Sequence, residues 1–411
     1  MDGVRVQAPE TGSGQNSGRE KTSQPETGRQ RTNRLPGVVA VGSLVFGIWG
    51  LAWMLGADSY PFGEVPPDGD RLSLLAYLPE QVGAGLIAVL GFLGVPAALA
   101  HTRTEWSASA YRPLLGFTGV QVVVFGLLAP SVLVVMVTGY LLVLLGLPAA
   151  LVALLVGAWR QRTTRMVVLL ILLAVAALEL ITGLFDWAAF KDLAKEISGG
   201  PEKVGSRPLF VYGAFLVGCG WAVLGVRGLR SARDRCLRCG RPGARWTRPE
   251  VARRWGFWAT VIAAMCPLPY ALLRMTWLLP NPIGFSAAEL DAEPGIKLFG
   301  LGLGLIALAS AVATLGLIRP WGEVWPRWIP YRAGRPVPLK AVVIPGAAAA
   351  TLLLVGSPSL VSLAWSADAG TLENVGNLLI FPFPLWGAAV GLATAAYYYR
   401  RRPPCPTCHL S

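Results

Sequence analysis

Charged residues are scarce in this chain. Asp, Glu, Lys and Arg make up 14% of its 411 residues, whereas soluble globular domains carry about 25%. Hydrophobic residues make up 54%, and the mean hydropathy is +0.52. So few charges cannot cover the surface of a soluble protein, which excludes that class. Lipid must cover the remaining surface, so the composition predicts an integral membrane protein.

Histidine is scarcer still, and its scarcity excludes several enzyme classes. The chain has 2 His, His101 and His409, so HExxH zinc motifs and serine-histidine catalytic arrangements have almost nothing to use. No GxxxxGK[ST] phosphate-binding loop is present, and the glycines of GLGLGL at 300–305 lie inside a predicted helix. The sequence therefore argues against metalloprotease and ATP-driven activities.

Apolar residues are nearly absent from residues 1–35, which are rich in Gly, Ser, Thr, Gln and Glu. A segment of this composition has too little apolar surface to bury and is predicted to be disordered. A cleavable signal peptide has only a short basic region before its apolar core. Here a long polar tail precedes a full spanning segment, so we expect a cytoplasmic tail followed by an uncleaved helix.

Long apolar runs fill most of the remaining chain. About 20 apolar residues span a bilayer as a helix, and the runs predict about ten such helices. They are placed near 36–57, 81–100, 112–129, 131–158, 166–189, 208–226, 255–280, 298–318, 341–365 and 377–399. The apolar run from Leu114 to Trp159 is divided near Pro130, because proline removes a hydrogen-bond donor. The predicted fold is all-α, a polytopic transmembrane helix bundle.

Arginine is distributed unevenly between the predicted loops. Most of the 36 Lys and Arg residues flank one set of helix ends, at 29–34, 103–112, 160–165, 227–254, 319–340 and 400–402. The opposite loops hold few basic residues and collect acids, at 58–80, 289–293 and 368–373. Because basic flanks stay in the cytoplasm during insertion, the pattern predicts cytoplasmic N- and C-termini in a plasma-membrane protein. Every loop agrees with an even number of helices.

This topology also gives the predicted organisation. Helices one to six occupy 36–226, a basic cytoplasmic loop with a CxxC motif occupies 227–254, helices seven to ten occupy 255–399, and a cytoplasmic tail with a second CxxC occupies 400–411. The formal charge of +13 follows from the loop arginines. No aromatic-interleaved groove motif accompanies it. We therefore expect the lipid bilayer as a partner and no nucleic acid.

A short internal similarity links the first and seventh predicted helices. Their outer ends read LAWMLGADSYPFG and RMTWLLPNPIGF, and each has Trp and leucine before Pro and Gly. This pattern would fit a repeat in which helices one to four correspond to helices seven to ten. It would equally follow from the recruitment of Trp, Pro and Gly to outer membrane boundaries.

Two CxxC motifs are predicted to lie on the same cytoplasmic side. Cys236 and Cys239 are in the large basic loop, and Cys405 and Cys408 follow the last helix. Four thiols in two pairs match structural zinc, and Gly240 permits the positive φ that a turn around the sulfurs requires. A thiol redox pair and ordinary reduced cysteines are the alternatives. The zinc hypothesis requires the sixth and tenth helices to be neighbours at their inner ends.

Charged residues inside the predicted helices form a second candidate site. Glu179 and Asp186 are seven residues apart on the fifth helix, hence on one face, and Arg274 lies in the seventh. At 1.5 Å per residue, Asp186 and Arg274 are at matching depth. Intramembrane charges are costly and often functional, which favours a polar substrate or proton site. A structural ion pair, or an arginine reaching the outer interface, is the alternative.

Three segments resemble a known group of proteins. RPWGEVWPRWIPYRAGRPVP, LWGAAVGLATAAYYYRRR and the terminal CPTC are similar to uncharacterised multi-pass membrane proteins of actinobacteria, mainly over the last 150 or so residues. The resemblance implies a membrane location and carries no activity. In the first segment, the spacing of Trp321, Trp325 and Trp328 fits an interfacial aromatic belt, with partner docking as the alternative.

The sequence thus favours a non-enzymatic membrane protein that acts in transport or as a scaffold or regulator. An intramembrane enzyme and a zinc- or redox-sensing membrane protein are the alternatives. A transporter predicts a polar cavity near the bilayer midplane, whereas a scaffold predicts a dry bundle with its working surface around the cysteines.

Overall fold

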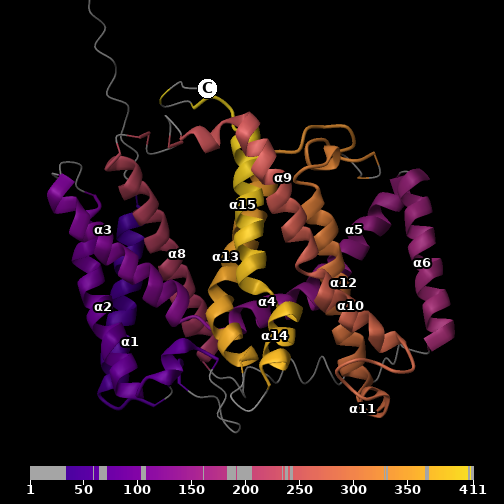
Figure 1. Ribbon diagram of the computed structural model, residues 1–411, viewed down its shortest axis with the longest axis horizontal. Coiled ribbons are helices and arrows are strands. Elements are labelled where there is room, and N and C mark those ends of the chain that lie inside the picture. The colour runs from indigo at the N-terminus through magenta and orange to yellow at the C-terminus, as the bar shows by residue number, and fades with distance from the viewer. Residues whose placement is uncertain are drawn as a thin grey trace, which may run out of the picture. The chain divides into compact units, whose positions relative to one another are not determined.

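The computed structural model shows an all-helical protein (Figure 1). It describes residues 34–58, 60–63, 72–102, 108–160, 162–182, 191, 206–233, 235–236, 239–240, 244–327, 329, 332–365, 370–405 and 408. Over these ranges it contains no β-strand, and only two isolated β-bridges occur, between Ser73 and Ser131 and between Val324 and Pro336. The predicted all-α class is confirmed.

The helices follow one another with short connections. They are α1 (Leu35–Met54), α2 (Glu80–Ala100), α3 (Ala108–Val123), α4 (Leu133–Leu141), α5 (Leu147–Arg160), α6 (Arg162–Thr182), α8 (Arg207–Ser231), α9 (Pro249–Met265), α10 (Leu268–Met275), α11 (Ala287–Ala292), α12 (Pro294–Leu315), α13 (Leu339–Ala364), α14 (Thr371–Ile380) and α15 (Phe383–Arg401). Two π-helical segments, η2 (Val124–Leu128) and η3 (Leu142–Gly146), continue α3 and join α4 to α5.

Among the described residues, 9 helical segments are long and apolar enough to cross a bilayer. They comprise α1, α2, α3 with η2, α4 with the start of α5, α8, α9 with α10, α12, α13, and α14 with α15. The chain is therefore a multi-pass membrane protein. The predicted helix at 166–189 overlaps α6, which has 21 residues, but residues 183–189 lie outside the described part of the chain. The count of ten stays a prediction.

Proline divides two of the predicted spans. The helix predicted at 255–280 is interrupted at Cys266 and Pro267, and the one predicted at 377–399 is interrupted at Phe381 and Pro382. Proline has no N–H and its ring clashes with the preceding turn, so these two uninterrupted helices were wrong. The turn predicted near Pro130 is confirmed, because the helix ends at Leu128 and resumes at Leu133.

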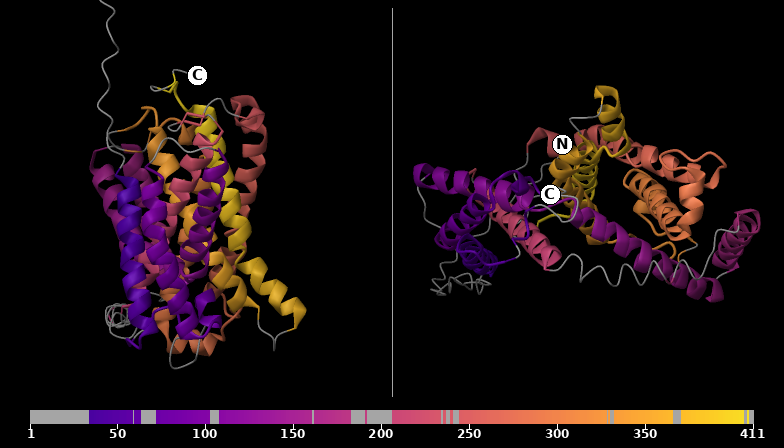
Figure 2. Two further views of the ribbon diagram at one scale, coloured as in Figure 1. Left: turned by 90° about the vertical axis from the view of Figure 1, so that its left-hand side faces the viewer. Right: turned by 90° about the horizontal axis from the view of Figure 1, so that it is seen from below.

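The short helix α14 projects from the bundle at the end opposite the C-terminus (Figures 1 and 2). Leu372, Val375 and Leu379 lie on one face of this helix and are all exposed, whereas Asn374 is buried. An apolar face of this kind, on a short helix beside the spans, is typical of a helix that lies in the membrane interface.

The first group of packed helices contains α1, α2, α3 and α8. Small residues bring their backbones together: a Cβ added to Gly91 of α2 would lie 2.5 Å from the Cα of Gly47 in α1. A Cβ added to Gly218 of α8 would lie 2.6 Å from the Cα of Gly126 in η2. Close packing of small residues is a main source of helix association in lipid.

The second group contains α9, α12, α13 and α15, with α10 against α12. Gly256 of α9 faces Ala396 of α15 so closely that a side chain would overlap the alanine methyl. Ala259 and Ala263 continue the same buried face of α9, and Ala393 lies buried on α15. The group is therefore held by the same small-residue packing as the first.

The same helix contacts occur in both groups. α1 packs on α2 and α8, and α8 packs on α3; correspondingly, α9 packs on α12 and α15, and α15 packs on α13. After α1 the chain places Phe62 against Trp53, with ring centroids 6.0 Å apart, and after α10 it places Phe285 against Trp277, 5.3 Å apart. The predicted similarity has a structural counterpart, but α8 rather than the fourth predicted helix corresponds to α15.

The segment from α4 to α5 lies between the groups. α4 packs on α8 and α13, η3 packs on α12, and α6 packs on α5 (Figure 2). Val135 of α4 contacts α13 at Gly356, where an added Cβ would lie 2.5 Å from Val135 Cγ2. α4 therefore links the two groups, each of which ends in a helix that runs into a CxxC motif.

The helix ends gather at two levels, seen as the upper and lower sides of Figure 1. We call the level where α8, α12 and α15 end and α9 and α13 begin the basic end. There, the rings of Trp246 and Tyr399 have centroids 5.4 Å apart. At the opposite end, Arg207 Nη1 donates a hydrogen bond to Gly63 O at 3.1 Å. The described loops alternate between these levels as the arginine distribution predicted.

Candidate metal centre

Four cysteines from two distant segments come together at the basic end. The Sγ atoms of Cys236, Cys239, Cys405 and Cys408 all lie within 4.8 Å of one another. Cys236 Sγ is 4.0 Å from Cys405 Sγ, and Cys239 Sγ is 3.4 Å from Cys408 Sγ. The four are thiols, not disulfides. The structure therefore brings together all four residues that the sequence singled out, and α8 and α15 end beside each other there.

A tight turn after α8 positions the first pair. The chain folds back at the helix end, where Arg235 N donates a hydrogen bond to Arg230 O at 2.9 Å. Gly240 N then donates to Cys236 O at 2.7 Å, which closes a turn around the two cysteines. Gly240 has a φ of +73°, so the positive φ predicted for it is confirmed.

Prolines release the second pair from α15. The helix ends at Arg401, and Arg402 is already extended, with φ −63° and ψ 129°. Pro403 and Pro404 follow, and neither can donate the N–H that another helical turn requires. Cys405 is only 4% exposed, whereas the other three cysteines are half-buried. The pair thus reaches the α8 side through a short extended segment.

Aromatic residues hold the loop after α8 against α15 and α9. Trp246 packs edge to face on Tyr399 of α15 and lies against Trp255 of α9, with ring centroids 6.0 Å apart. Trp255 Nε1 also donates to Trp246 O at 3.0 Å. Arg402 stacks on the other side of this contact, with its guanidinium carbon 5.1 Å from the Tyr399 ring centroid. These contacts fix the cysteine-bearing loop near the end of α15.

The geometry suits a tetrahedral ion with four sulfur ligands. Zinc bound by thiolates at about 2.3 Å places the sulfurs about 3.8 Å apart. The two contacts between the segments, 4.0 and 3.4 Å, lie on either side of that value. Four cysteine ligands would leave no open position, which is the arrangement of a structural rather than a catalytic zinc.

The predicted intramembrane charges are only partly described. Glu179 belongs to α6, and Asp186 lies outside the described residues. Arg274 lies in α10, where its Nε donates to Tyr270 Oη at 3.1 Å and its guanidinium carbon is 4.1 Å from the Trp277 ring centroid. An aromatic cage therefore surrounds the arginine, and the predicted match with Asp186 stays a prediction. The spacing of Tyr270 and Trp277, four before and three after Arg274, was the signal for these contacts.

The sequence reasoning attached no site to His101, which the structure places in a hydrogen-bonded group at the basic end. Its Nδ1 lies 3.1 Å from Tyr111 Oη, and its Nε2 lies 3.0 Å from Thr118 Oγ1. Burial lowers the pKa of the imidazole from its ordinary value of 6.5. Both partners belong to another helix, so no local motif could have indicated the group.

Comparison of the chain with protein-family models, with curated proteins and with solved structures gave no match. The interpretation of the four-cysteine site therefore depends on its own geometry and chemistry.

Proposed function

We propose that this protein is a non-enzymatic scaffold of the plasma membrane, in which four cytoplasmic cysteines hold a structural zinc ion. The observation that carries the proposal is the convergence of Cys236, Cys239, Cys405 and Cys408 within 4.8 Å. Zinc bound there would join the last helix of the first group to the last helix of the second. The metal would supply folding energy and no reaction.

The arginine distribution supports the orientation in this proposal. The basic end carries the Arg-rich loops, and basic flanks remain in the cytoplasm during insertion. Ten spans, with α6 among them, would place both termini on that side. The cytoplasm keeps thiols reduced, which suits metal-binding cysteines and argues against permanent disulfides there.

The interior of the first helix group favours a scaffold over a transporter. Trp221 Nε1 donates to Ser43 Oγ at 3.2 Å, and Gln121 Nε2 donates to Leu90 O at 2.7 Å, with all four residues at least largely buried. Buried polar groups are thus used for helix packing. The two best-formed pockets among the described residues lie at the opposite end and at the basic end, away from the middle of the spans.

Metal analysis of the purified full chain tests the zinc site. Protein prepared without chelator should carry about one zinc per chain, because four thiolates complete one tetrahedral site. Cys405→Ser should remove most of it. Cys219→Ser is the matched control, since Cys219 lies within α8 and outside the cluster, and it should keep the metal.

Metal-free wild-type protein, with unmodified thiols, would overturn the zinc proposal. Mass analysis under non-reducing conditions covers the redox alternative, in which Cys239 and Cys408 lose two protons and two electrons to an oxidant and form a disulfide. A stable disulfide in protein taken directly from cells would favour that alternative. A reporter fused after Ser411 tests the orientation, and activity on the outer side would contradict it.

A further inference from the structure

A cavity of about 830 Å³ opens at the basic end, away from the cysteines. Arg253, Arg254 and Phe257 of α9 form one wall, Arg319 and Glu323 after α12 form another, and Arg400 of α15 completes it. These residues come from three separate segments of the second helix group. None of them belonged to a sequence motif, because the contacts that form the cavity are between helices.

The cavity has more positive than negative charge. Four arginines line it, with two glutamates, Glu250 and Glu323, which leaves a formal excess of two positive charges. Glu323 is already engaged, because its Oε1 lies 3.9 Å from Arg400 Nη1. Within the described ranges, Arg253, Arg254 and Arg319 form no ion pair with a carboxylate. Three guanidinium groups are therefore available to an anionic ligand.

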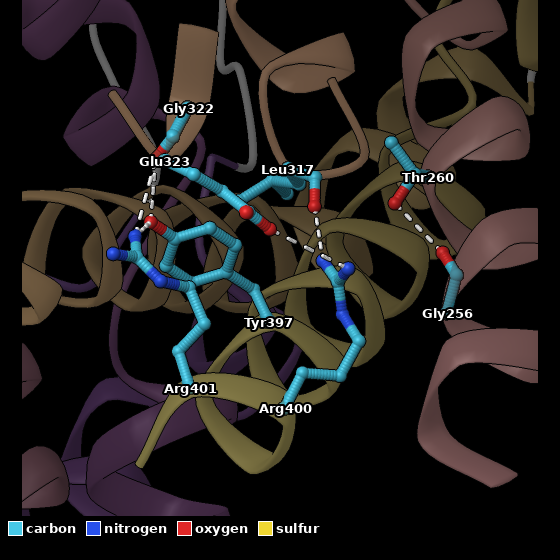
Figure 3. Close-up of polar contacts among 8 residues, drawn as sticks. All are labelled: Gly256, Thr260, Leu317, Gly322, Glu323, Tyr397, Arg400 and Arg401. Atoms are coloured by element: carbon cyan, nitrogen blue, oxygen red, sulfur yellow. Dashed lines mark hydrogen bonds and ion pairs between the residues drawn. The ribbon is translucent and has the colours of Figure 1, made fainter. Parts of the chain in front are cut away.

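The walls of the cavity are fixed by contacts that do not involve a ligand. Arg400 also donates to Leu317 O, and Tyr397 Oη donates to Gly322 O at 2.6 Å (Figure 3). Arg401 Nη1 reaches the same Gly322 carbonyl oxygen at 3.4 Å. These bonds attach the loop after α12 to α15. A site ordered in advance binds more tightly, because less conformational entropy is lost on binding.

The surroundings of the cavity are apolar on the side of the spans. Phe257 lies one helical turn after Arg253, about 6 Å along the axis, and is 46% exposed. Trp258 beside it is 66% exposed. Aromatic side chains of this kind are enriched where membrane meets water. The arginines therefore lie at the level of lipid headgroups, next to a surface that acyl chains would cover.

We propose that this cavity binds the phosphate group of an anionic phospholipid from the leaflet at the basic end. Arg253, Arg254 and Arg319 contact the phosphate, Arg400 forms the fixed rear wall, and the acyl chains lie along Phe257. Arginine forms paired hydrogen bonds with phosphate oxygens, and basic pockets between transmembrane helices suit anionic headgroups. The proposal does not depend on whether the cysteines bind zinc.

Native mass spectrometry of the purified full chain tests this site. The protein is mixed in detergent with equal amounts of phosphatidylglycerol, which is anionic, and phosphatidylcholine, which is zwitterionic. Wild type should retain phosphatidylglycerol preferentially. The variant Arg253→Gln with Arg254→Gln should lose this preference, by about fivefold for each arginine. The control Arg327→Gln with Arg335→Gln removes the same charge outside the cavity and should keep the preference.

Two results would overturn the proposal. One is equal retention of both lipids by wild type, or an unchanged preference in the α9 double variant. The other is displacement of phosphatidylglycerol by millimolar inorganic phosphate, which would assign the cavity to a soluble anion. If the double variant fails to fold, Arg319→Gln provides the same test on an exposed loop residue, with an expected loss of about fivefold.

Discussion

Cys239 Sγ lies 3.4 Å from Cys408 Sγ, although 169 residues separate the two in the chain. Chelation of zinc should therefore destabilise the whole helix bundle, because a ligand that binds only the folded state adds about 4 kcal/mol at 1,000 times its Kd. Thermal unfolding in detergent, with and without chelator, measures the effect. The variant Cys236→Ser with Cys239→Ser should unfold at the lower temperature and should not respond to chelator. A wild type that ignores the chelator would count against the zinc site.

Gly91 of α2 should tolerate no side chain. Gly91→Val would force the Cβ against Gly47 and should cost about 1–3 kcal/mol or more, as overpacked sites do. Gly85→Ala is the matched control on the same helix, since a Cβ there would meet only Met54 Sδ, at 3.6 Å. Because alanine favours helix over glycine by about 1 kcal/mol, this control should be neutral or stabilising. Unfolding curves in detergent distinguish the two, and equal effects would argue against the α1–α2 contact.

His101 should make stability depend on pH. Burial lowers the pKa of the folded-state imidazole below 6.5, so the unfolded chain takes up the proton first as the pH falls. The contribution of the neutral imidazole is complete above about pH 6.5 and declines below it.

Melting temperatures between pH 7.5 and 5.5 test this prediction against His101→Gln, which can keep one hydrogen bond but does not titrate. The thiolates also respond to acid, so the informative quantity is the difference between the two proteins. Parallel pH profiles would show that the imidazole does not titrate in this way.

Arg274 should be specific for its guanidinium group. Arg274→Lys keeps the charge but replaces a planar group that stacks on Trp277, 4.1 Å from the ring centroid, so it should cost about 1 kcal/mol. A double-mutant cycle with Asp186→Asn then tests the predicted ion pair. Additive losses would mean that the two charges do not interact.

The sequence allowed the spans to be predicted better than their interruptions. Apolar run length decided the spans, but proline alone does not decide a break. Pro96, Pro345 and Pro358 lie inside continuous helices, whereas Pro267 and Pro382 mark breaks. Neighbouring helices can compensate for the lost hydrogen bond, and those neighbours are not visible in local sequence.

The four-cysteine site was predictable because topology alone placed both pairs on one side. The adjacency of α8 and α15 was a requirement of that hypothesis, and the sequence could not supply it independently. The contacts of His101 and the arginine-lined cavity join residues from different helices. Their partners are set by helix packing, for which a single sequence carries no direct signal.

The division of the cysteine cluster between two segments orders the events of synthesis. Cys236 and Cys239 leave the ribosome early and must wait until α15 has been translated and inserted before Cys405 and Cys408 can reach them. Closure of the cluster therefore reports that every intervening helix has entered the bilayer. Chains that stall earlier would display two unsatisfied thiols on a mobile arginine-rich loop, a feature that a quality-control protease is able to distinguish from the finished product.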